Sequence, residues 1–130
     1  MAEALLREQL LTKISEVSVC SAGLHALIDY PADPLAQELM LERGLDISTH
    51  RARQITKELA FNSDLILIMD VEQQRHIEHQ FPGLRGRVHR IGALSDFDIP
   101  DPYKQPRIIF EHALKLIEQG LNEWRTLLWN

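Results

Sequence analysis

The sequence has a single cysteine, Cys20, and no excess of positive charge. One thiol permits no disulfide within the chain, so we expect a protein of the reducing cytoplasm. The 14 Lys and Arg side chains are outnumbered by 19 Asp and Glu side chains, which gives a net charge of −5. This balance argues against a general nucleic-acid-binding protein, because such proteins carry a basic excess.

Long hydrophobic runs are also missing. The longest purely apolar run covers residues 65–69, whereas a membrane-spanning helix needs about 20 apolar residues. The N-terminus has no basic leader followed by an apolar core, so we expect no signal peptide. The sequence also has no glycine-rich phosphate loop, no Ser-His-Asp set and no paired-cysteine metal motif.

What is present is the composition of an ordinary globular domain, with 45% hydrophobic and 25% charged residues. A chain of 130 residues is expected to form one domain over residues 1–130. Its patterns predict alternating helices and strands. The predicted strands cover residues 17–22, 65–69 and 87–91, and the predicted helices cover residues 2–11, 34–43, 49–55, 71–80 and 107–129.

The run at residues 65–69 indicates the fold class. It is apolar at every position and has an aspartate on each side, which is typical of a strand buried on both faces in a parallel sheet. Strands separated by helices then predict an α/β fold with crossover connections. Three strands are few for such a sheet, and a further strand ahead of the opening helix would complete the alternation.

The best candidate for chemistry is Asp101, which lies between Pro100 and Pro102 in a loop after the last predicted strand. Ligands of open α/β folds bind beyond the carboxyl ends of the strands. Two prolines stiffen the backbone around the carboxyl group, as a general acid requires, and Tyr103 could supply an aromatic wall. The alternative is a proline-rich surface turn with aspartate as a turn residue.

Other reactive side chains have plainer explanations. Cys20 alternates within a predicted strand and is expected to be buried there, and the sixth residue after it is Ala26 rather than the arginine of a cysteine phosphatase. His76 and His79 are expected on a solvated helix face. The basic cluster, defined as Arg85, Arg87, His89 and Arg90, could contact a phosphorylated partner, but a charged edge strand explains it as well.

Six short motifs together resemble the bacterial low-molecular-weight protein tyrosine phosphatases. The resemblance is closest to the branch paired with the tyrosine autokinases of capsule and exopolysaccharide export, and it covers nearly the whole chain. Each motif is weak alone, but their common order and spacing are specific. They are Ser-Ala-Gly-Leu at 21–24, Ala-Asp-Pro at 32–34, His-Arg-Ala-Arg-Gln-Ile at 50–55, the apolar run with its aspartates at 64–70, Arg-Gly-Arg-Val at 85–88 and Ile-Pro-Asp-Pro-Tyr at 99–103.

The resemblance implies a fold, an activity and roles for individual residues. The fold is a three-layer α/β/α sandwich, phosphotyrosine protein phosphatase I-like, and the activity is phosphotyrosine hydrolysis through a cysteinyl phosphate, without a metal or organic cofactor. The implied partner is a tyrosine-phosphorylated protein such as a tyrosine autokinase. The implied site residues are Asp101 as general acid, Tyr103, Leu24 and His25 as substrate-binding residues, and Ser21 and Asp70 as supports of the phosphate loop.

One departure from the family pattern is decisive. The segment Met-Ala-Glu-Ala-Leu at 1–5 resembles the helix that directly follows the family's Cys-x5-Arg-Ser-Pro loop. We therefore expect that the first strand, the nucleophilic cysteine and the phosphate-binding arginine are missing from this chain. In the family the first strand lies inside the sheet, so the chain is expected to associate through unpaired strand edges or to be less stable than its relatives.

Three functions compete at this point. In the first, the chain is part of a tyrosine phosphatase that is active when intact and inactive as given. In the second, it is a non-catalytic phosphatase-like binding protein. The third is an arsenate reductase of the same fold, but that chemistry passes oxidation among several thiols and this chain has only one.

Overall fold

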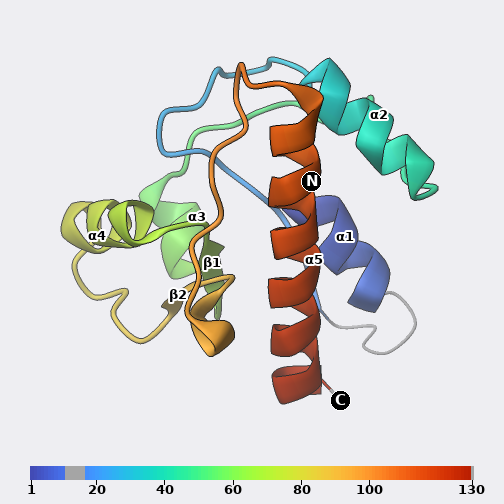
Figure 1. Cartoon of the computed structure of the whole chain (residues 1–130). Helices are drawn as coiled ribbons and strands as arrows, with labels where there is room; N and C mark the ends of the chain where they lie inside the picture. Colours follow the sequence, from blue (N-terminus) through green and yellow to red (C-terminus); the bar gives the residue numbers. More distant parts are fainter. Residues whose placement is uncertain (11–16, 130) are drawn as a thin grey trace.

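The computed structural model describes residues 1–10 and 17–129. Two parallel strands, β1 (Ile66–Ile68) and β2 (Val88–Arg90), form its sheet, and α4 (Val71–Gln80) connects them (Figure 1). Leu67 of β1 pairs with His89 of β2. A parallel pair joined through a helix is the basic unit of an α/β fold, so the predicted fold class is confirmed.

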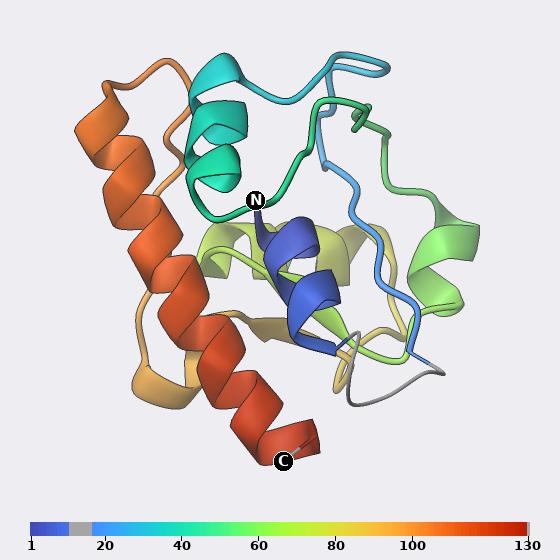
Figure 2. The same ribbon diagram turned by 90° about the vertical axis from the view of Figure 1, so that its right-hand side faces the viewer.

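Helices cover both faces of this sheet (Figures 1 and 2). On one face α5 (Arg107–Trp129) packs against α1 (Ala2–Leu10) and α2 (Pro34–Glu42). On the other face lie α4 and the short helix α3 (Lys57–Phe61). The result is the three-layer α/β/α arrangement that the resemblance implied.

Strand β1 shows how one apolar run serves both layers. Leu67 and Met69 pack against the apolar core formed with α1, α2 and α5. Ile66 and Ile68 pack against a second core formed with α3 and α4. Since successive strand side chains point to opposite faces, a strand buried on both sides must be apolar at every position.

The long helix α5 provides much of the first core, and it spans the predicted residues 107–129. Gly120 lies where α5 meets the chain just after β2, because a Cβ atom built there would come within 2.6 Å of the carbonyl oxygen of Ile91. The last turns extend past this contact, and Leu128 there is 47% exposed. The buried residues of α5 are Phe110, Ala113, Leu114, Ile117, Gly120, Leu121 and Trp124.

The helix boundaries agree closely with the sequence signals. Asp33 caps α2 by accepting a hydrogen bond from the Leu35 amide, and Pro34 is its first residue, as predicted. Helix α4 has the predicted bounds, and α1 covers residues 2–10 of the predicted 2–11, residue 11 lying outside the described residues. The 3-10 turn η1 (Ala93–Ser95) was not predicted. None of the described helices is both long and apolar enough to cross a membrane.

Three predictions are wrong. Residues 17–22 form no strand, and Cys20 is exposed rather than buried. A strand needs a neighbour for its hydrogen bonds, and in the described chain no strand pairs with this segment, although Gly23, just after it, forms an isolated bridge with Gln54. Residues 49–55 form no helix either, because their backbone pairs with residues 23–31 instead, and the next helix, α3, is capped by Thr56.

Candidate active site

The loop that carries Asp101 passes the carboxyl end of the sheet. It leaves β2 through η1 and returns toward β1, where the Ile99 amide donates a hydrogen bond to the Met69 carbonyl oxygen at 2.9 Å. The Ile99 side chain is buried in the first core. The predicted site therefore lies at the end of the strands where α/β folds place their ligands.

Asp101 has an exposed carboxyl group on a tight turn. Its Oδ1 atom accepts a hydrogen bond from the Tyr103 amide at 3.0 Å, and the Gln105 amide donates to the Pro102 carbonyl oxygen at 2.8 Å. Pro100 and Pro102 fix φ on both sides of the aspartate. The local sequence thus holds an accessible carboxyl group in one place, which is what a proton donor needs.

Asp101 also lies beside the beginning of α1. A cavity of about 140 Å³ separates the loop from α1, the end of β1 and the middle of α5. The start of α1 and Asp101 thus share one enclosure, although they are about 100 residues apart in the sequence. The cavity is lined by Met1, Ala2, Met69, Ile99, Pro100, Asp101, Pro102, Ala113 and Ile117.

The predicted opposite wall, Leu24 and His25, lies elsewhere. Leu24 is half-buried against the second core, and the exposed ring of His25 packs edge-on against His76 of α4, with ring centroids 5.2 Å apart. Neither residue lines the Asp101 cavity, and Tyr103, which is 52% exposed, does not line it either. His76 was predicted on a solvated helix face, and it is exposed on α4. The structure adds its ring contact with His25.

Gln54 holds the Leu24 loop in place. Its Nε2 atom donates to the Leu24 carbonyl oxygen at 2.6 Å, and its Oε1 atom accepts from the Ala26 amide at 3.0 Å. A single side-chain amide therefore satisfies a donor and an acceptor on the same turn. The motif at residues 50–55 contained Gln54, but nothing in the sequence connected it with residue 24.

The two predicted supports have different surroundings. The Ser21 hydroxyl donates to Oε1 of Glu3 in the first turn of α1 at 3.1 Å, and Glu3 also lies 3.5 Å from His50. Ser21 thus contacts the helix that follows the family's phosphate loop. Asp70 caps α4 by accepting from the Gln73 amide at 2.8 Å, so capping alone accounts for an aspartate there. A bracing role for either residue remains a prediction.

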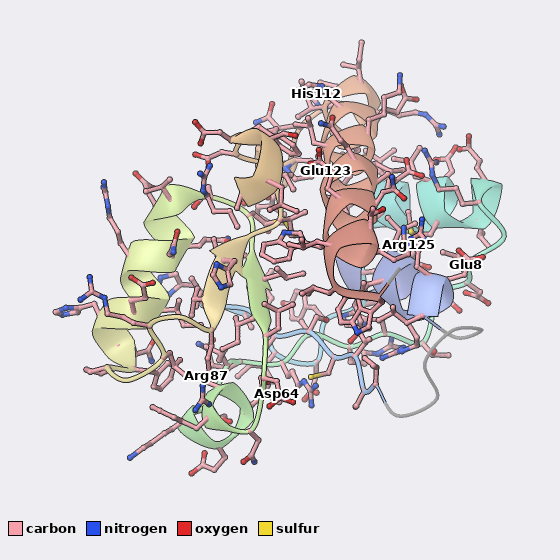
Figure 3. The ribbon with its side chains drawn as sticks, turned by 90° about the horizontal axis from the view of Figure 1, so that it is seen from below. Glu8, Asp64, Arg87, His112, Glu123 and Arg125 are labelled. Carbon is pink, nitrogen blue, oxygen red and sulfur yellow. The ribbon has the colours of Figure 1, made fainter. Side chains whose placement is uncertain are left out.

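Two further features belong to the surroundings of the site. A further hollow, of about 350 Å³, lies at the other end of α1, lined by Glu8, Gln9, Asn122 and Arg125. Glu8 and Arg125 are labelled in Figure 3. None of the predicted site residues lines this hollow, so we assign the site to the smaller cavity beside Asp101. Among residues 1–10 and 17–129, no three His, Cys, Asp or Glu side chains gather closely enough to hold a metal ion.

Comparison with known proteins gives one consistent result. A family model described as low molecular weight phosphotyrosine protein phosphatase matches residues 1–129. A probable low molecular weight protein-tyrosine-phosphatase, EpsP of Ralstonia nicotianae, is 48% identical over 124 residues, which cover 95% of this chain and 83% of EpsP. Etp, a low molecular weight protein-tyrosine-phosphatase of Escherichia coli, is 36% identical over 129 residues, covering 98% of this chain and 84% of Etp.

A solved structure agrees with the sequence relatives. Wzb of Vibrio vulnificus, determined in complex with benzylphosphonate, superposes with a TM-score of 0.89 at 33% sequence identity. The superposition covers 98% of this chain and 88% of Wzb. The arrangement of helices and strands described above is therefore shared nearly throughout the chain.

Proposed function

The chain belongs to the family of low molecular weight phosphotyrosine protein phosphatases, and we propose that the protein, when it carries the family's nucleophile loop, hydrolyses phosphotyrosine on a protein substrate. The observation that carries this proposal is the exposed Asp101 carboxyl group, held on a rigid turn in the same cavity as the start of α1. In the family pattern the phosphate loop ends at the start of that helix.

The proposed reaction has two steps. A cysteine thiolate attacks phosphorus, the bond between phosphorus and the phenolic oxygen breaks, and protonated Asp101 gives its proton to the departing phenolate oxygen. Water then attacks the cysteinyl phosphate and releases inorganic phosphate and the thiol. General acid catalysis of this kind contributes a factor of about 10²–10⁴ to the rate. Tyr103, Leu24 and His25 are the proposed contacts of the substrate around the phosphotyrosine.

The 130 residues alone do not hold the nucleophile of this reaction. Their one cysteine, Cys20, is exposed in the segment ahead of Gly23 and has Ala26 at the sixth following position. Without a thiolate there is no covalent step, and without loop amides and an arginine nothing stabilises the charge of the transition state. We therefore propose that these residues alone are inactive.

The first experiment compares two preparations. The 130-residue chain and the protein as its own cell makes it are assayed for hydrolysis of a phosphotyrosine peptide, and the mass of the second is measured. We expect hydrolysis only by the second preparation. In that protein Asp101→Asn should lower kcat for phenyl phosphate by a factor of about 10²–10⁴.

The matched control is Asp46→Asn, because Asp46 is exposed and only accepts a hydrogen bond within its own turn. It should leave kcat unchanged. Full activity of Asp101→Asn would remove the general-acid role. An inert protein from the cell would overturn the proposed enzymatic function altogether.

A non-catalytic binding protein is the second candidate, and two observations favour it. The sheet of the described residues has only two strands, so each strand has one edge without a strand partner. Arg85 and Arg87 of the basic cluster are exposed beside β2. Saturable binding of a phosphotyrosine peptide without hydrolysis by the cell-made protein would support this function against the enzymatic one.

The proposal also covers the location of the protein in the cell and its binding partners. We propose a cytoplasmic protein whose partner is a tyrosine-phosphorylated protein, such as a tyrosine autokinase. The open strand edges should also let the 130-residue chain associate with itself. Size-exclusion chromatography between about 1 and 100 μM, the range in which weak protein contacts form, should show a shift toward larger species. A cooperative monomer throughout that range would contradict self-association.

A further inference from the structure

Arg90, the last residue of β2, binds the segment that leads to Asp101. Its Nη2 atom donates to Oδ1 of Asp96 at 2.8 Å, and its Nη1 atom donates to Oδ1 of Asp98 at 2.9 Å and to the Phe97 carbonyl oxygen at 3.3 Å. The Arg90 side chain is 17% exposed, whereas its partners Asp96 and Asp98 are 88% and 48% exposed. One rigid side chain therefore fixes three consecutive residues of the loop.

The base of this contact is itself held in place. The Trp124 indole nitrogen donates to the carbonyl oxygens of Arg90 and Ile91 at 3.1 and 3.0 Å. On the other side of η1, the Ser95 hydroxyl donates to Glu123 of α5, which faces the turn in Figure 3. The hydrogen bonds from Trp124 thus fix the backbone of Arg90 relative to α5. The Arg90 guanidinium group in turn holds residues 96–98 relative to that backbone.

The turn between Arg90 and Asp98 is closed tightly. The Phe97 amide donates to the Gly92 carbonyl oxygen at 3.0 Å, and a Cβ atom at position 92 would collide with the Phe97 carbonyl oxygen. Asp96 adopts a left-handed conformation with φ of 53°, which is uncommon for a residue other than glycine. The hydrogen bonds of Asp96 and Asp98 also raise the pKa of Arg90.

Only two anchors separate this turn from Asp101. The first is the hydrogen bond from the Ile99 amide to Met69, and the second is Pro100. Asp98 directly precedes Ile99, so a displacement of Asp98 acts on the Ile99 anchor and, through the stiff Pro100, on the peptide that carries Asp101. Charge-assisted hydrogen bonds from a planar guanidinium group add a directional constraint at this turn.

We propose that Arg90 is a positioning residue for Asp101: it holds residues 96–98 so that the carboxyl group stays beside the start of α1. The inference rests on the proposed function, because it assigns Arg90 to the proton-transfer step. Arg90 does not line the Asp101 cavity, so it acts through the loop. This role differs from those predicted from the sequence, in which the basic cluster that includes Arg90 either contacts a phosphorylated partner or belongs to a charged edge strand.

Arg107 provides a matched control. It too is bound by carboxylates: those of Glu38 and Glu42 join the start of α5 to α2, and that of Glu111 lies one turn further along α5. Arg107→Ala therefore removes an arginine with its ion pairs and leaves the turn at residues 91–98 intact. Any effect specific to the loop should appear in Arg90→Ala and be absent from Arg107→Ala.

The first test needs no enzymatic activity. Hydrogen exchange of the Ile99 and Tyr103 amides is measured in the 130-residue chain. We expect exchange about tenfold faster at both amides in Arg90→Ala, since local opening becomes easier, and no change there in Arg107→Ala. Arg90→Lys should lie between them, because one ammonium group lacks the planar fork that binds two carboxylates. Equal exchange in all variants would overturn the proposal.

The second test uses the active protein as its own cell makes it. Arg90→Ala should lower kcat for phenyl phosphate about tenfold or more and change kcat little for a nitro-substituted aryl phosphate, whose leaving group needs less protonation. A purely structural effect would lower both equally and would overturn the proposal. If the cell-made protein is inactive, the proposed function fails, and a loop displacement found by exchange would then be assigned to loop structure alone.

Discussion

Two loops of the molecule are held in different ways. Residues 91–103 are bound mostly by their own neighbours in the chain, through Arg90, Gly92 and the turn at Asp101, with more distant hydrogen bonds from Ile99 to Met69 and from Ser95 to Glu123. Residues 17–26 are bound only by distant segments, through Gln54, Arg53 and Glu3. The first loop closes on itself, whereas the second takes its shape from whatever lies beside it.

The difference shows which loop conformation is specified by local contacts and which by distant ones. A self-closing loop keeps its conformation when β1, β2 and α5 are folded, since its partners outside the loop come from these elements and from Met69 just after β1. A loop without local partners depends on the rest of the sheet, so a missing neighbour changes it first. In the described chain this segment forms no strand, and Cys20 within it is exposed.

Replacing one glycine in each loop by alanine is expected to give the largest difference in stability between the two loops. Gly92→Ala is expected to lower the free energy of unfolding by about 3 kcal/mol, because the new Cβ collides with a backbone oxygen that cannot move freely. Gly23→Ala should cost less, about 1 kcal/mol, because its Cβ would come no closer than 3.1 Å to the Ala26 methyl group and 3.3 Å to the Ala26 Cα atom. Urea unfolding of both variants measures the two values.

Gly86→Ala is the control in which a glycine is replaced by alanine without a steric collision. Gly86 has a φ of 90° and open space around its Cβ position, so the substitution reports backbone strain without a collision. Equal losses for Gly92→Ala and Gly23→Ala would show that the two loops are packed alike, and the distinction between them would be lost.

Removing the distant support of the second loop should have a smaller effect. Gln54→Ala leaves the Leu24 carbonyl oxygen and the Ala26 amide without their side-chain partner, which should cost about 1–2 kcal/mol. Gln105→Ala removes a glutamine whose side chain is exposed and should change stability by less than about 0.5 kcal/mol. If Gln54→Ala costs no more than this control in urea unfolding, Gln54 does not hold the loop.

Much of the fold could be predicted because its signals are local. The Asp33-Pro34 helix start, the bounds of α4 and α5, and the doubly buried strand at residues 65–69 each depend on residues close together in the sequence. The position of Asp101 at the carboxyl end of the sheet followed from topology. These features need no knowledge of a distant partner.

The remaining features depend on contacts that a sequence pattern does not contain. The alternation at residues 17–22 is that of a strand, but a strand forms only beside another strand. The contact of His25 with His76 and the support of residue 24 by Gln54 join segments that are 51 and 30 residues apart. For Arg90 a signal existed, since an arginine closely followed by Asp96 and Asp98 suggests an internal ion pair.

The indole of Trp124 gives the molecule an optical reporter. Its nitrogen is bound to the backbone where β2 becomes the loop, and the ring of His89 lies 5.4 Å away. Any movement of that junction alters the polarity around a buried chromophore, so its emission follows the loop directly. The other tryptophan, Trp129, lies at the far end of α5, and its replacement by phenylalanine would leave a single fluorophore that reports on the loop.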